Sequence, residues 1–240
     1  FWVIFIAVYV TAASLLPVWI LLQPRDYLSS FLLYGMMIIA FVGVFGSNMS
    51  VELPAFTGWA GINGNSNLFP VLFITVACGA VSGFHALIGS GTTAKQLNSE
   101  KDAKVIGYGA MIIESALAVV SIIAVGVVFS KTNIGGGDVF QLSAPPTIFA
   151  GGVATMVATM FGGVADFSNP IYDTVYTLLT LAVSVFALTS LDSGTRLARY
   201  LFAELFVPEG KTRDDLTGAA KFFSHPLVGT LIMVVVGCGM

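Results

Sequence analysis

Two ionisable side chains lie inside apolar stretches of the sequence, where an unpaired charge is costly. His85 lies close to the end of one such stretch, and Glu114 lies ten residues into the apolar run Val105–Phe129. A histidine or carboxylate that changes its charge within a membrane suits a proton relay. Each could instead be a structural group that is hydrogen-bonded to a neighbouring helix. At helical spacing Glu114 shares a face with small residues only, so we expect this face to look into a helix bundle. These small residues are Gly107, Ala110, Ala118 and Ser121.

The stretch from Thr75 to Lys95 is rich in small residues. Gly79 and Gly83 form a GxxxG pair, which lets a neighbouring backbone approach closely. Gly89–Thr93 weakens the helix, and transporters place broken helices at substrate and ion sites. A tight packing seam followed by an ordinary helix end is the simpler alternative. As candidates for a proton or substrate pathway we take His85, Glu114, Ser82, Gly83, Ser90, Thr92 and Thr93.

Four charged residues are candidates for an inner gate or latch. Arg25 and Asp26 lie in a short polar break, where a topology signal and a tight turn explain them equally well. Asp192 and Arg196 are spaced i, i+4, so we expect them to pair as a latch at the inner end of their helix. Most such pairs are solvated salt bridges that contribute little to stability.

The sequence lacks the common enzyme and metal motifs. Ala86 and Leu87 follow His85, so the HExxH pattern of a zinc protease is absent. The residues before Lys95 do not have the phosphate-loop spacing, and Cys78 and Cys238 provide no Cys/His zinc spacing. We therefore expect neither an enzyme nor a bound metal or cofactor.

Composition indicates a protein that is solvated mainly by lipid. Of 240 residues, 56% are hydrophobic and only 10% are charged, against about 25% charged in a soluble domain. The mean hydropathy is +0.91. A net charge of −3 gives no basic surface for nucleic acid. The composition predicts an all-α, polytopic bundle of helices embedded in the bilayer.

Apolar length predicts spans near residues 1–22, 28–45, 69–89, 105–129 and 174–190. Pro17 is expected to kink the first span, and the polar break Gln23–Tyr27 would join the first two in an antiparallel hairpin. The weakly hydrophobic segment 148–164 predicts a re-entrant or interfacial helix. A last run, 227–240, is shorter than the ~20 residues of a spanning helix, so we expect the central part of a larger chain.

The positions of Lys and Arg predict the orientation of the chain. Arg25, the Lys95–Lys104 cluster and the Arg196–Lys221 stretch contain nine of the ten basic residues, so these segments are expected in the cytoplasm. The loops Gly46–Asn67 and Ser130–Pro146 then face outward. An odd number of crossings must separate Ser130–Pro146 from Arg196.

Four motifs, in order, resemble those of the carbon starvation protein A (CstA) family. Leu16–Ser29 is similar to LPVWxLLxPRDYLS, and Phe73–Lys95 contains a block similar to ACGAVSGFHALISSGTT. Ile106–Ser115 resembles IGYGxMxxES, and Leu191–Arg199 resembles xDxxTRxxR. The loop Ser130–Pro146 is shorter than the outer loop of some family members.

The resemblance implies a multi-pass transporter of a bacterial or archaeal inner membrane, used during carbon starvation. It implies peptides or pyruvate as solutes, with protons, and a fold with broken helices and inverted repeats of the amino acid–polyamine–organocation type. The alternative is a starvation-linked membrane sensor or scaffold that moves no solute. The sequence leaves the substrate, the coupling ion and the oligomeric state open.

Overall fold

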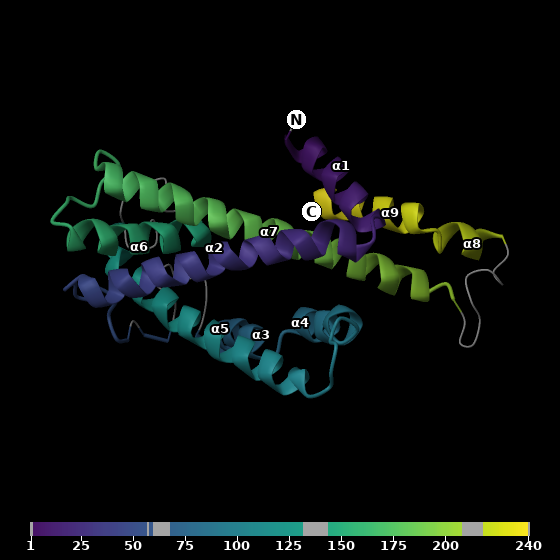
Figure 1. Cartoon of the computed structure of the whole chain (residues 1–240), viewed down its shortest axis with the longest axis horizontal. Helices are drawn as coiled ribbons and strands as arrows, with labels where there is room; N and C mark the ends of the chain where they lie inside the picture. Colours follow the sequence, from purple (N-terminus) through teal and green to yellow (C-terminus); the bar gives the residue numbers. More distant parts are fainter. Residues whose placement is uncertain (1, 57, 60–67, 132–143, 208–217, 240) are drawn as a thin grey trace. The chain divides into compact units, whose positions relative to one another are not determined.

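The computed structural model of the chain describes residues 2–56, 58–59, 68–131, 144–207 and 218–239. Within these ranges the regular structure is helical throughout, which confirms the all-α prediction (Figure 1). The α-helices are α1 (Trp2–Leu15), α2 (Val18–Gly46), α3 (Phe73–Ala80), α4 (Gly83–Ile88), α5 (Asp102–Val127), α6 (Pro145–Met160), α7 (Pro170–Glu204), α8 (Ala219–Phe223) and α9 (Pro226–Gly239). Two π-helical turns, Leu68–Leu72 and Gly89–Thr93, and a 3₁₀ turn, Phe129–Lys131, complete the set.

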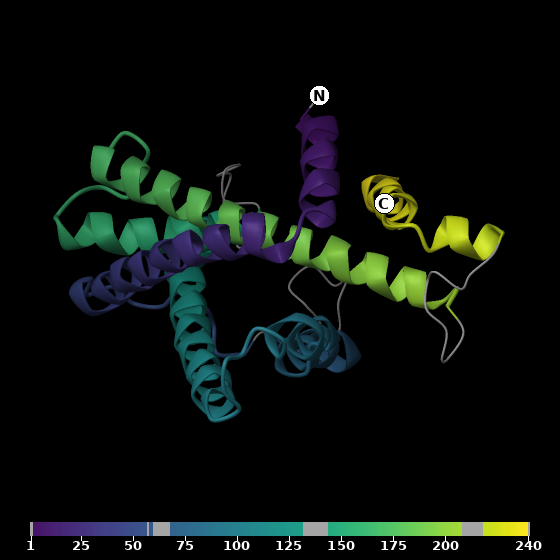
Figure 2. The same ribbon diagram turned by 45° about the vertical axis from the view of Figure 1, so that its right-hand side comes forward.

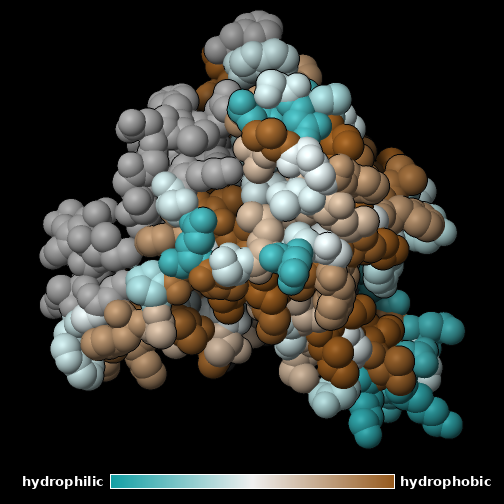
Figure 3. Space-filling model, turned by 90° about the vertical axis from the view of Figure 1, so that its left-hand side faces the viewer, coloured by the Kyte–Doolittle hydropathy of each residue, from teal (hydrophilic) through white to brown (hydrophobic). Residues whose placement is uncertain are grey.

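Four helical segments are long and apolar enough to cross a bilayer. They are Trp19–Gly46, Leu68–Gly91, Asp102–Val127 and Pro170–Glu204. Large apolar side chains lie exposed along these helices, for example Ile38 at 63% and Ile122 at 68% exposure, and they colour much of the surface in Figure 3 brown. A surface of this kind is stable against lipid rather than water. These features confirm the prediction of a membrane helix bundle.

The chain forms two compact units. Unit 1 contains Phe1–Ser29, Phe84–Lys95 and Phe186–Met240, and unit 2 contains Ser30–Gly83 and Gln96–Val185. Helix α2 begins in unit 1 and ends in unit 2, and α7 begins in unit 2 and ends in unit 1.

The first two predicted spans differ from the helices observed. Helix α1 ends at Leu15, and α2 runs without interruption through the polar residues Gln23–Tyr27, with Pro24 inside it. The predicted hairpin turn is therefore wrong. The chain bends sharply six residues before Gln23, around Pro17, where a kink was expected (Figure 2). Proline has no N–H to continue α1, whereas its fixed φ suits the residue that precedes a new helix.

The α-helical pattern of the glycine-rich segment is interrupted at two places, one of them not predicted. Helix α3 ends at Ala80 and α4 begins at Gly83, so the α-helical pattern breaks at Val81–Ser82. Gly89–Thr93, the expected break, is a π-helical turn closed by the Ala94 N–H bond to the Gly89 carbonyl at 2.9 Å. Within the described residues a Cβ added at Gly79 or Gly83 would meet nothing within 4 Å. No described neighbour approaches this pair, and the break separates the two glycines, so close packing here stays a prediction.

Helix α6 is the most buried helix of unit 2, because small residues let its neighbours approach closely. A Cβ at Gly152 would overlap the backbone of Ala124 in α5, and a Cβ at Gly43 of α2 would lie 3.3 Å from the Met156 Cβ. Every residue from Ala150 to Ala158 is buried. A helix lying on the membrane surface would expose one side, so burial argues against the interfacial alternative for this segment.

Contacts within unit 2 also determine the direction of α6. Gly43 lies against Met156 and Gly46 lies against Met160, so α6 runs parallel to the end of α2. Helix α7 then starts beside the end of α6, where Tyr172 packs on Ala158. The ends of α2 and α6 and the start of α7 therefore lie at the same level of unit 2.

Two hydrogen bonds join the segment after α2 to the end of α5. The Glu52 N–H bonds to the Gly126 carbonyl at 2.9 Å, and the Glu52 carboxylate accepts the Ser130 N–H at 3.2 Å. The Val51 side chain fills the space that the absent side chain of Gly126 leaves. These bonds satisfy backbone groups that the end of α5 would otherwise leave open.

Candidate functional site

A buried ion pair joins two membrane-length helices in unit 1. Arg25 of α2 donates from Nη1 to the Asp192 Oδ2 of α7, and the same Nη1 donates to the Tyr9 hydroxyl of α1 at 2.6 Å. The Asp192 side chain is completely buried, and that of Arg25 is 17% exposed. Removing one partner of such a pair leaves an uncompensated buried charge, which costs several kcal/mol.

Two further arginines of α7 bind the backbone where α1 ends. The Arg196 Nη2 donates to the Ala13 carbonyl at 2.8 Å and to the Leu16 carbonyl at 2.7 Å. In a continuing helix the Ala13 carbonyl would accept a bond from residue 17, but Pro17 has no N–H. The guanidinium group of Arg196 supplies the missing donor.

Arg199 acts in the same way one turn further along α7. Its Nη1 donates to the Ser14 carbonyl at 2.8 Å, and its side-chain stem packs against Gly229 of α9. Arg196 and Arg199 are buried, with 7% and 6% of their surfaces exposed. Both guanidinium groups are therefore committed in part to holding α1 against α7.

The cluster carries more positive than negative charge. Three arginines and one aspartate, namely Arg25, Arg196, Arg199 and Asp192, leave a formal excess of two positive charges, and the exposed Asp26 beside Arg25 offsets one of them. Several buried polar atoms have no hydrogen-bond partner among the residues the structure describes. They are Nε and Nη2 of Arg25, Oδ1 of Asp192, Nε of Arg196 and of Arg199, and Oγ of Ser14. A site with free guanidinium donors and excess positive charge can bind an anionic group.

The expected latch between Asp192 and Arg196 is not the pair that forms. Asp192 makes its ion pair with Arg25 of α2, and no ion pair between Asp192 and Arg196 occurs in the described part of the chain. Arg196 turns instead to the carbonyl groups beside Pro17. The spacing of Asp192 and Arg196 allowed their pairing, but the open carbonyl groups of α1 compete for the same donors.

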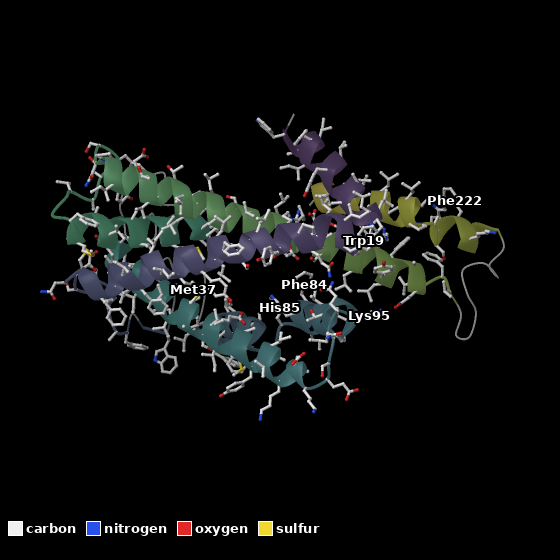
Figure 4. The ribbon with its side chains drawn as sticks, viewed as in Figure 1. Trp19, Met37, Phe84, His85, Lys95 and Phe222 are labelled. Carbon is white, nitrogen blue, oxygen red and sulfur yellow. The ribbon has the colours of Figure 1, made fainter. Side chains whose placement is uncertain are left out.

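The glycine-rich segment packs on α7 next to this cluster. The ring of Phe84 lies 3.4 Å from the position of a Cβ on Gly194, two residues beyond Asp192, and Gly91 faces Leu197. His85 is exposed and meets the Phe84 ring edge to face, at 5.6 Å between ring centres (Figure 4). The structure thus brings the α4 segment beside the part of α7 that carries the buried charges.

The remaining pathway candidates make local contacts or none that the structure records. The Ser90 hydroxyl donates to the Ala86 carbonyl of its own helix at 3.0 Å, and Thr93 is exposed. Ser82 is half-buried at the break between α3 and α4. The side chain of Thr92 lies outside the described residues.

Glu114 lies on α5 in unit 2, and its side chain is exposed. Gly107, Ala110 and Ala118 on the same face are exposed among the described residues, Ser121 is half-buried, and the packing of this face inside a bundle stays a prediction. The buried part of α5 is its C-terminal end, which contacts α6.

The described residues contain no group of three or more His, Cys, Asp or Glu side chains placed to hold a metal ion.

Tyr9, Ser14 and Pro17 are site residues that the sequence analysis did not assign to this cluster. Pro17 carried a usable signal, since a proline after an apolar helix leaves a carbonyl group open. A nearby arginine on another helix is one means of satisfying that group in an apolar medium.

Comparisons with known proteins place these residues in a family context. A family model described as "Carbon starvation protein CstA" matches residues 1–135 and 130–240. The chain is 37% identical to "Peptide transporter CstA" of Bacillus subtilis (strain 168), over 85% of this chain and 39% of that protein. It is 36% identical to the Escherichia coli (strain K12) protein of the same name, over 85% of this chain and 35% of that one.

A further relative has a different printed activity. "Pyruvate/proton symporter BtsT" of Escherichia coli (strain K12) is 45% identical over 58% of this chain and 19% of its own length. The chain thus spans little more than a third of the length of the first two relatives. No solved structure matches it. Because the family model covers both halves of the sequence and several relatives exceed 30% identity, the chain belongs to the carbon starvation protein CstA family.

Proposed function

We propose that the protein is a multi-pass transporter of the cell inner membrane that takes up small nutrients, peptides or pyruvate, together with protons. Membership of the CstA family supports this proposal, because relatives are named as peptide transporters and as a pyruvate/proton symporter. The observation that carries it is the buried charge cluster between α1, α2 and α7, since ionisable groups within membrane helices mark solute and proton pathways.

We infer that the cluster of Arg25, Asp192 and Arg196 belongs to an inner gate. Arg25 lies two turns from the start of α2, and Asp192 lies three turns from the end of α7. The distribution of basic residues supports the placement of both helix ends at the cytoplasmic side. His85, Ser90, Thr92 and Thr93 of unit 1 are then candidates for the solute path beside this cluster. Ser82, Gly83 and Glu114 of unit 2 stay candidates for the solute and proton pathway.

Helix α6 is re-entrant in this proposal. Its parallel course beside α2, and its end level with the start of α7, support entry into and exit from the same side of the membrane. At 1.5 Å per residue its sixteen residues measure about 24 Å, less than the ~30 Å hydrocarbon core. One crossing by α7 then separates the outer segment after α5 from Arg196, as the charge distribution requires.

The decisive experiment is uptake by the protein as its cell makes it, purified and reconstituted in proteoliposomes. Labelled alanylalanine and labelled pyruvate are compared with and without an inward proton gradient. We expect one of them to accumulate and the accumulation to collapse when an ionophore dissipates the gradient. Binding of either compound without flux, in protein shown to be folded, would favour the sensor alternative.

A further inference from the structure

The free edge of one guanidinium group suggests how solute and proton are coupled. Arg25 uses only Nη1 for Asp192 and Tyr9, while its Nε and Nη2 have no partner among the described residues. Nε–H and Nη2–H point to the same side of the planar group and form the fork that binds a carboxylate through two parallel bonds. The side chain retains 17% exposure, so this edge is not sealed.

The other arginines of the cluster are less suited to the same task. Arg196 and Arg199 donate to the Ala13, Leu16 and Ser14 carbonyl groups, and each has only its Nε among the free atoms. Binding a carboxylate with two bonds would require either group to release the end of α1. Arg25 alone combines a free two-donor edge with partial exposure in this cluster.

Asp192 is the acidic partner that such binding would affect. Its side chain is fully buried, its Oδ2 faces Arg25, and its Oδ1 has no partner in the described structure. The charged groups that act on it are Arg25 and Asp26 of α2 and Arg196 of its own helix. Of the other elements packed here, α1 contributes the Tyr9 hydroxyl, and α9 carries no charged residue. Helix α4 contacts α7 through the ring of Phe84, and His85 beside it is exposed.

We propose that Arg25 binds the carboxylate of the transported solute through its Nε–Nη2 edge and that Asp192 takes up the accompanying proton. This inference rests on the proposed transport function and identifies its substrate class as carboxylate-bearing solutes. A second anion beside Asp192 repels its negative charge and so favours uptake of a proton. Conversely, protonation of Asp192 leaves the buried Arg25 without a counter-ion until the solute supplies one. Each event therefore favours the other, and the linkage is reciprocal.

The charge and proton balance closes at one proton per carboxylate. The solute adds one negative charge, Asp192 gains one proton from water, and Arg25 keeps its own protons throughout. When the solute leaves on the inner side, the Asp192 proton leaves to water and the ion pair with Arg25 reforms. The net charge of the cluster is the same before and after loading.

The test measures proton uptake and transport separately, using pyruvate and alanylalanine as probes with their amides as controls. In detergent, binding of the probe is expected to remove one proton from a weakly buffered solution that contains a pH indicator. D192N is expected to bind the probe without taking up this proton. In proteoliposomes D192N is expected to lose proton-driven accumulation by about tenfold or more while still exchanging labelled for unlabelled solute.

Three variants keep the test independent of folding. D192E retains a titratable group and is expected to restore proton-driven accumulation in part. Asp173→Asn, at the exposed start of α7, is the matched control and is expected to behave as the wild type. R25K keeps the charge but not the fork, and its affinity for the carboxylate probes is expected to fall about tenfold. The wild type is expected to bind the amides as weakly as R25K binds the carboxylate probes.

Two results would overturn the inference, and they differ from failure of the proposed function. Proton uptake by D192N equal to that of the wild type would remove Asp192 from the coupling. Equal affinity for pyruvate and pyruvamide, or for the peptide and its amide, would remove Arg25 as the carboxylate site. Probe binding with the expected proton uptake but without flux in liposomes would support the site and reject transport.

Discussion

Pro17 determines how the arginines of unit 1 are used. By leaving the Ala13 carbonyl open, it creates an acceptor that Arg196 of α7 satisfies between two apolar helices. Arg196 is thereby withdrawn from Asp192, and Arg25 becomes the counter-ion of that carboxylate. Because Pro17 has no N–H, Arg196 binds backbone carbonyl groups, whereas Arg25 keeps donors that have no partner among the described residues.

We expect Arg196→Met to destabilise the protein by about 2–3 kcal/mol, because two backbone carbonyl groups lose a charged donor. Thermal unfolding of the purified protein in detergent measures the change. Lys221→Met removes an exposed cation and serves as the control, with an expected change near zero. Equal unfolding midpoints for the two variants would show that Arg196 does not stabilise the end of α1.

The residues of the site could be predicted in part. Arg25, Asp192 and Arg196 stand out because charge is rare in apolar helices, and all three lie in the cluster observed. Their pairing could not be predicted, since it depends on which backbone groups of α1 remain open. For Glu114 the sequence-based argument assumed that small residues on a helix face imply packing, whereas that face is exposed in the described chain.

At the scale of elements, helix α6 depends on glycine for its position. A side chain at Gly152 would overlap the Ala124 backbone of α5, and backbone cannot move aside as a flexible side chain can. We expect Gly152→Val to destabilise the protein by about 1–3 kcal/mol, because α5 and α6 must separate. Thermal unfolding in detergent again measures the effect.

Gly35→Val in α2 is the matched control, because a Cβ there meets nothing within 4 Å. We expect this variant to be as stable as the wild type or slightly more so, since glycine weakens a helix. If both variants unfold at the wild-type temperature, close packing of α6 on α5 does not contribute to stability.

The start of α7 is stabilised by the side chain of Asn169, which caps its first turn. The Asn169 side-chain oxygen accepts the Ile171 N–H at 3.1 Å, its amide donates to the Val164 carbonyl at 3.0 Å, and Pro170 begins the helix. We expect Asn169→Ala to cost about 1 kcal/mol in stability, because the first turn loses its cap. Asn169→Asp keeps the capping oxygen and should lose less. An alanine variant as stable as the aspartate variant would contradict the capping role.

At the scale of the whole molecule, apolar length predicted the membrane helices better than it predicted their ends. The segments Asp102–Val127 and Leu68–Gly91 agree with the expected spans 105–129 and 69–89. The polar residues Gln23–Tyr27 were interpreted as a turn, because a local pattern cannot reveal that Asp192 compensates Arg25 from another helix. Long-range charge pairing of this kind is decided by the fold and not by local sequence.

The path of the chain through the membrane yields the last prediction. In protein whose Cys78 and Cys238 are replaced by alanine, single cysteines are placed at Asn48, Asn98 and Val164, of which each native side chain is exposed. In right-side-out vesicles we expect a membrane-impermeant maleimide to label N48C and V164C but not N98C. Asn98 lies in the Lys95–Lys104 segment, which the excess of basic residues assigns to the cytoplasm.

Position 164 distinguishes the two possible courses of α6. A re-entrant α6 returns to the outer side before α7 begins, so V164C and N48C should react equally before the vesicles are opened. An α6 that crossed the membrane would place V164C with N98C, and both would react only after permeabilisation. The packing of Gly43 and Gly46 against Met156 and Met160 argues for the first course, because it sets the end of α6 level with the end of α2. Labelling of V164C only in opened vesicles would therefore refute the re-entrant helix.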